Sequence, residues 1–144
     1  MPVIYDTDKD FPVGGSKVLR RSGDDAATIA AAGVTLHEAL AAADLLAQED
    51  IRVMVVDLYC IKPVDAETLR QAAHRTGLVL TVEDHYPEGG LADAVRTALA
   101  DIPTPVYSLA VAKKPLSGKP DELLDYEGIS HAAIAGKIRE LLRK

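Results

Sequence analysis

The stretch from Leu78 to Leu99 constrains the fold and function of this 144-residue chain more than any other. Its first five residues, 78–82, are apolar or β-branched and predict a buried strand. From Leu91 onward, apolar residues recur at helical spacing and predict one buried helix face. The polar turn EDHYPEGG (83–90) lies between the two. In an open α/β sheet, ligands and partner surfaces are usually found at such a turn, after a strand and before a helix.

The side chains of this turn support two interpretations. In a chemical interpretation, its carboxylates and histidine form an acid–base pair or a metal site, and its glycines present amides to an anion. In a structural interpretation, the carboxylates cap the helix and complement its dipole. Tyr86, an aromatic residue among charges, is typical of an interface anchor. We therefore expect the turn to have a structural or interface role rather than a catalytic one.

Strand and helix patterns alternate along the rest of the chain. Such alternation through short connections predicts right-handed crossovers and a mostly parallel sheet. The first two strands read as a hairpin-like pair around the turn at Gly23, but the sequence does not decide whether they pair directly with each other. Strands are expected at 17–20, 26–32, 51–57, 78–82 and 105–111, and helices at 35–50, 63–74, 91–99, 122–124 and after Ser130.

Several residues predict where helices begin. Thr35 followed by Glu38 is a capping-box pattern. Asp65 and Ser130 are expected N-caps of the second and last long helices. Residues 1–16 are polar, with two prolines and two glycines, and predict an arm without regular structure. We expect this arm either to be mobile or to lie on a surface supplied by another part of a larger protein, and 17–144 to form one domain.

The composition excludes several classes of protein. The net charge of −6 argues against nucleic-acid binding, which needs a basic face. The single cysteine, Cys60, allows no internal disulfide or cysteine-based metal framework, and a buried thiol is expected there. No apolar run is long enough to span a bilayer and the N-terminus does not read as a signal peptide, so we expect a cytoplasmic protein without membrane contact. Dinucleotide, P-loop and nucleophile-elbow motifs are absent.

Five segments together resemble one known domain. Residues 10–14 (DFPVG), 32–40 (AGVTLHEAL), 61–65 (IKPVD), 82–90 (VEDHYPEGG) and 117–120 (SGKP) are similar, in order and spacing, to the C-terminal domain of transketolases, the animal-type branch in particular. The resemblance covers nearly the whole chain. It implies a three-layer α/β/α fold whose five-stranded sheet is mostly parallel, with the first strand antiparallel.

The resemblance also implies an activity for a larger protein. Transketolases use thiamine diphosphate and magnesium to transfer a two-carbon ketol unit between sugar phosphates, and they are homodimers. In that family the cofactor, metal and sugar-phosphate ligands lie in the two preceding domains, and this chain has no Gly-Asp-Gly with a downstream Asn. We therefore assign it no catalytic, cofactor-binding or metal residue. The resemblance implies a domain, inactive alone, that supports packing and dimerisation with the preceding domains or a separate N-terminal subunit. The candidate interface positions that it implies are Asp84, His85, Tyr86, Glu88 and Gly89.

Two alternatives remain at this point. In the first, the chain is a free-standing regulatory module that binds a small anion through the turn at 84–90 and nearby lysines. In the second, it is the equivalent domain of a related thiamine enzyme, such as a deoxyxylulose phosphate synthase or a keto-acid dehydrogenase β subunit. Segments 84–86 and 117–120 weigh against this second alternative.

Overall fold

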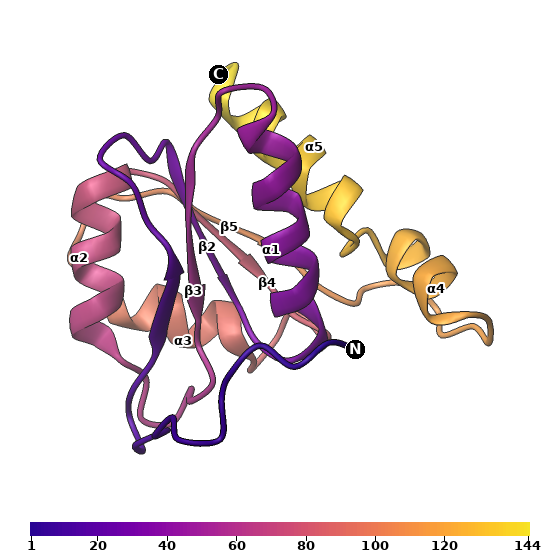
Figure 1. Ribbon diagram of the computed structural model, residues 1–144, viewed down its shortest axis with the longest axis horizontal. Coiled ribbons are helices and arrows are strands. Elements are labelled where there is room, and N and C mark those ends of the chain that lie inside the picture. Colours follow the sequence, from indigo (N-terminus) through magenta and orange to yellow (C-terminus); the bar gives the residue numbers. More distant parts are fainter.

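A five-stranded sheet separates two layers of helices in the computed structural model, which describes residues 1–144 (Figure 1). The strand order is β1-β3-β2-β4-β5, with β1 antiparallel to β3 and every other pair parallel. The predicted three-layer fold, with its first strand antiparallel, is confirmed. The strands are β1 (Lys17–Arg20), β2 (Ala27–Ala31), β3 (Val53–Asp57), β4 (Val79–Val82) and β5 (Val106–Leu109), and the helices are α1 (Val34–Ala47), α2 (Ala66–Thr76), α3 (Leu91–Ala98), α4 (Pro120–Glu127) and α5 (His131–Leu142).

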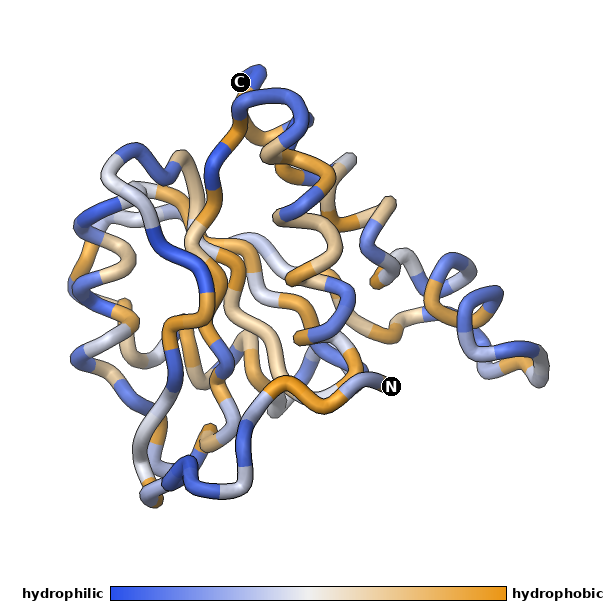
Figure 2. Tube along the Cα trace, in the orientation of Figure 1, coloured by the Kyte–Doolittle hydropathy of each residue, from blue (hydrophilic) through white to orange (hydrophobic).

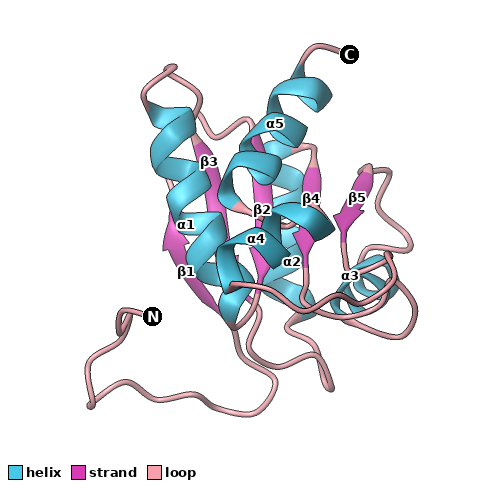
Figure 3. Cartoon of the chain, turned by 90° about the vertical axis from the view of Figure 1, so that its right-hand side faces the viewer, coloured by secondary structure: helices cyan, strands magenta, loops and turns pink.

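The central strand β2 is buried on both faces by the two helix layers. Helices α1 and α5 cover one face, and α2 and α3 cover the other, whereas α4 projects to the side (Figures 1 and 3). Within β2, Ile29 packs into the cluster beneath α1 and α5, and Ala30 into the cluster beneath α2 and α3. The alanines of this strand let both layers approach closely. No helix combines the length and apolarity needed to cross a membrane.

Strand β1 does not pair with β2, which answers the question that the hairpin-like sequence pattern left open. It pairs with β3, where Lys17 lies opposite Asp57. The burial of the two strands explains the difference. Strand β2 is buried at every position and needs neighbours on both sides, whereas β1 is half exposed and suits an edge of the sheet.

Two of the three predicted helix starts are confirmed. The Asp65 carboxylate accepts a hydrogen bond from the Thr68 amide at 3.1 Å, and the Ser130 hydroxyl accepts one from the Ala133 amide at 3.2 Å. The helix expected at 122–124 is longer than predicted. Helix α4 begins at Pro120, a residue suited to the first turn, and continues for two turns to Glu127.

The predicted capping box of Thr35 and Glu38 is wrong. Helix α1 already begins at Val34, so Thr35 lies inside the first turn. Its buried hydroxyl lies 2.9 Å from the carbonyl oxygens of Ala32, the residue after β2, and Val82, the last residue of β4. Glu38 instead accepts hydrogen bonds from His131 at the start of α5. Long-range partners have replaced the local ones.

The arm, residues 1–16, has no helix or strand, as predicted, but it lies on its own domain. The Tyr5 hydroxyl donates to the Asp57 carboxylate at 2.6 Å. The Phe11 ring packs edge-on between the rings of Tyr5 and Tyr59, with centroid distances of 4.9 and 5.0 Å. The arm therefore has a contact surface on its own domain, and this surface does not have to come from another part of a larger protein.

We predict that Thr35→Val lowers the free energy of unfolding by about 1–3 kcal/mol. The near-isosteric side chain removes the one hydroxyl proton that the Ala32 and Val82 carbonyls share, and it leaves the Ala32 amide without its acceptor. Urea unfolding followed by circular dichroism measures the change. Thr97→Val is the matched control, since Thr97 is exposed on α3, and it should change stability by less than about 0.5 kcal/mol. Equal effects from the two variants would contradict this role for Thr35.

Candidate functional site

The turn between β4 and α3 lies at the carboxyl edge of the sheet, the lower edge in Figure 1. Connections leave the central strand β2 toward β3 on one side, and β4 lies on its other side. A crevice is expected where the connections diverge in this way. A cleft of about 420 Å³ lies there, bounded by Gly33 after β2, Tyr59 after β3 and the turn after β4. The sequence-predicted turn therefore does lie at the cleft of the sheet.

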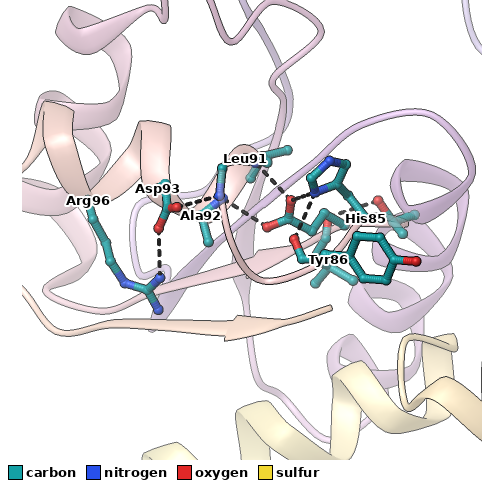
Figure 4. Close-up of polar contacts among 10 residues, drawn as sticks. His85, Tyr86, Leu91, Ala92, Asp93 and Arg96 are labelled. Atoms are coloured by element: carbon teal, nitrogen blue, oxygen red, sulfur yellow. Dashed lines mark hydrogen bonds and ion pairs between the residues drawn. The ribbon is translucent and has the colours of Figure 1, made fainter. Parts of the chain in front are cut away.

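Glu83, the first residue of the turn, is a helix cap. Its side chain is only 4% exposed. One carboxylate oxygen accepts the Leu91 amide at 2.8 Å and the other accepts the Ala92 amide at 2.9 Å (Figure 4). Both amides belong to the first turn of α3, where backbone donors lack partners and the helix dipole favours negative charge. The structural interpretation of this carboxylate is confirmed.

Gly90 is required by the position of that carboxylate. A Cβ at residue 90 would lie 1.9 Å from Glu83 Oε1 and 2.8 Å from His85 Nδ1. Neither contact is possible for a real side chain. The neighbouring Gly89 has a φ of 76°, a conformation that other residues rarely adopt. The two glycines thus serve the geometry of the cap.

The remaining candidate residues point outward. Asp84, His85 and Glu88 are exposed, and Tyr86 is 61% exposed. The His85 and Tyr86 rings meet edge to face with a centroid distance of 6.0 Å, away from Arg96 in Figure 4. The amide of Gly89 donates to the Asp93 carboxylate within α3. This arrangement exposes an aromatic side chain and several charges at the surface.

A second, apolar groove of about 390 Å³ adjoins the cleft, and Val34 and Asp84 line both. It lies between α4 and the segment that follows β5, and Leu116, on its rim, is 56% exposed. Sequence reasoning missed this groove. Leu116, an apolar residue inside a polar Pro- and Gly-rich segment, was the available signal.

The residues of this edge do not fit a metal or a diphosphate cofactor. Both oxygens of Glu83 are taken by backbone amides. No group of three or more His, Cys, Asp or Glu residues is placed to hold a metal ion. The same carboxylate occupies the N-terminus of α3, so an anion would meet negative charge at the turn proposed for it.

The other residues that sequence reasoning considered lie elsewhere. His131 is 2.7 Å from Glu38 and joins α5 to α1. Cys60 is half buried rather than buried, and its sulfur lies between the Gly14 amide and the Pro63 carbonyl at 3.3 and 3.2 Å. Neither residue forms part of a constellation with the turn.

The arm contacts the same edge through a hydrogen bond between half-buried Tyr5 and buried Asp57. Asp57 ends strand β3 and is 4% exposed, and burial raises the pKa of its carboxyl. Burial, together with the hydrogen bond to Asp57, raises the pKa of the Tyr5 hydroxyl well above its usual range. The folded state therefore favours protonated Tyr5. The arm stays bound to the end of β3 as long as the Tyr5 hydroxyl can donate its proton to Asp57.

Comparisons with known proteins agree on one family. Residues 15–134 match a family model described as "Transketolase, C-terminal domain". Human transketolase is 49% identical over 144 residues, which are 99% of this chain but 23% of that protein. Mouse transketolase-like protein 2 is 48% identical over the same share of each chain. The chain thus spans about a quarter of the length of these curated relatives.

Solved structures give the same answer for the fold. A structure described as "Split gene transketolase, inactive beta4 tetramer" superposes with a TM-score of 0.89 at 34% identity, over 96% of this chain and 46% of that one. Transketolase from Campylobacter jejuni superposes with a TM-score of 0.66 at 18% identity, over 97% of this chain and 20% of that one. The second likeness concerns the fold alone.

We predict that Gly90→Ala lowers the free energy of unfolding by about 2–3 kcal/mol, because the new methyl group displaces the Glu83 carboxylate from α3. Gly136→Ala is the matched control. A Cβ there meets nothing within 4 Å inside α5, so this variant should gain about 0.5–1 kcal/mol. Chemical denaturation measures both. A neutral Gly90→Ala would refute the close approach of the carboxylate.

We also predict that the arm loosens at alkaline pH. The pKa of Tyr5 is higher in the folded than in the unfolded chain, so its contribution to stability is complete below the ordinary tyrosine value of about 10 and is lost above it. Tyr5→Phe should cost about 1–2 kcal/mol at pH 7 and flatten the decline in stability above pH 10. Unfolding at a series of pH values measures this. Tyr86→Phe, at an exposed ring, should keep the wild-type profile, and an unchanged profile in Tyr5→Phe would contradict the prediction.

Proposed function

We propose that this chain, which belongs to the family of transketolase C-terminal domains, forms the C-terminal portion of a transketolase. The complete enzyme would transfer a two-carbon ketol unit between sugar phosphates with thiamine diphosphate and magnesium, in the pentose phosphate pathway. Because the chain spans 23% of the human relative and does not offer residues that fit the cofactor, the remaining portion would bind cofactor and substrate. The isolated chain would be inactive.

The observation that carries this proposal is the composition of the carboxyl edge. Ile61, Tyr86 and Leu116, three apolar side chains each more than 40% exposed, lie beside the adjoining cleft and groove. Asp84 and Glu88 stand next to them without a side-chain hydrogen bond or ion pair. Apolar anchors rimmed by free charges are typical of protein interfaces. We therefore propose that this edge packs against the preceding domains or a separate N-terminal subunit.

We extend the proposal to assembly and location. The complete enzyme would be a homodimer, with the candidate interface positions Asp84, His85, Tyr86, Glu88 and Gly89 contributing to the packing of its parts. A related split-gene transketolase is described as an inactive beta4 tetramer, which fits a chain that assembles through such surfaces without catalysing a reaction. A cytoplasmic location is part of the same proposal, and the single cysteine accords with a reducing compartment.

We predict that this chain binds the preceding two-domain portion from the same genome, and that Tyr86→Ala weakens binding about tenfold or more, the usual effect of losing a central aromatic anchor. Isothermal titration calorimetry measures the dissociation constant. Leu142→Ala is the control, because it removes an exposed apolar side chain from the opposite end of the sheet. Failure of the wild-type chain to bind, or equal losses in the two variants, would contradict the proposed interface.

A further inference from the structure

A second cleft lies at the opposite, amino edge of the sheet, the upper edge in Figure 1. It has a volume of about 390 Å³ and is bounded by the β1–β2 connection, the last turns of α1 and the start of β3. This edge is strongly hydrophilic in Figure 2. Its cationic lining consists of Arg20, Arg21 and Arg52, above an apolar floor that includes Ile51 and Val53.

Two of the three arginines have no partner within the chain. Neither Arg21 nor Arg52 makes a side-chain hydrogen bond or an ion pair, and both are exposed. Arg20 has a loose ion pair with Asp44 at 3.7 Å. The chain as a whole carries a net charge of −6, so three guanidinium groups around one cleft contrast with its average surface. Arginine is the side chain best suited to paired hydrogen bonds with phosphate oxygens.

The nearby acceptors do not account for these arginines. The Asp25 carboxylate already accepts the Ser22 amide at 2.8 Å and the Ser22 hydroxyl at 2.6 Å. The last carbonyls of α1 are also satisfied, because Leu46 accepts the Ile51 amide at 3.0 Å and Ala47 accepts the Asp50 amide at 3.1 Å. The guanidinium groups are therefore not needed to cap this helix. They remain available to a ligand.

We propose that the cleft bounded by Arg20, Arg21 and Arg52 binds a small phosphorylated anion. Arg21 and Arg52 hold the phosphate, and the apolar floor contacts the carbon part of the ligand. The volume is within the range of small-molecule sites. The site is distinct from the turn at 83–90, where a carboxylate already occupies the helix N-terminus, and it does not depend on the proposed packing of the carboxyl edge.

Titration of the ¹⁵N-labelled chain with pyrophosphate, followed by nuclear magnetic resonance, tests this site. We expect saturable amide shifts confined to residues 20–25 and 51–53. The double variant Arg21→Gln/Arg52→Gln should bind about tenfold or more weakly, because charge-assisted hydrogen bonds are lost. Asp44→Asn should bind about twofold to threefold more tightly, since it removes a competing negative charge from the wall of the cleft.

A matched double variant controls for net charge. Arg96→Gln/Lys9→Gln removes the same two positive charges away from the cleft and should bind pyrophosphate like the wild type. Parallel titrations with inorganic phosphate and glycerol 3-phosphate distinguish the source. If glycerol 3-phosphate binds more tightly than inorganic phosphate, the ligand of the cleft is a phosphorylated metabolite. If the two bind equally, the cleft recognises the phosphate group alone. Shifts spread over the surface, equal losses in the two double variants, or tighter binding of the wild-type chain to a single-stranded oligonucleotide than to pyrophosphate would overturn the proposal.

Discussion

The hydrogen bonds between the buried Glu83 carboxylate and the first amides of α3 are the interaction on which the candidate site depends. They join the end of β4 to the start of the next helix across eight residues of turn. Gly90 permits the approach, since any larger residue would overlap the carboxylate. The cap fixes the path of the turn and thereby directs Tyr86 and its charged neighbours outward. The Glu83 carboxylate, which the sequence offers as a candidate acid or base, instead caps helix α3. The residues that follow it in the turn remain exposed.

Much of the fold could be predicted from the sequence because its signals are local. Asp65 and Ser130 cap helices within three residues of themselves, and apolar runs mark the buried strands. The errors involve distant partners. Glu38 does not form its local capping box because His131, 93 residues away, takes its carboxylate. Docking of the arm depends on a contact between Tyr5 and a strand end 52 residues later, and no local pattern encodes it. The same holds for the groove near Leu116 and the arginine cleft, which arise only when separate connections meet.

The two edges of the sheet have different chemistry. The carboxyl edge presents exposed apolar side chains with unpaired carboxylates, a combination suited to burial against protein. The amino edge presents unpaired guanidinium groups over an apolar floor, a combination suited to a small anion. Under the two proposals, the carboxyl edge packs against another part of the enzyme, and the amino edge binds a small phosphorylated anion.

The most direct test is a ketol-transfer assay on three samples: this chain alone, the preceding two-domain portion alone, and an equimolar mixture, each with thiamine diphosphate and magnesium. If the chain is a supporting portion of a transketolase, it will show no activity alone, and its addition will raise the activity or thermal stability of the other portion. Thiamine-dependent ketol transfer by this chain alone would contradict a supporting role. A mixture that behaves as the sum of its parts would contradict the proposed packing.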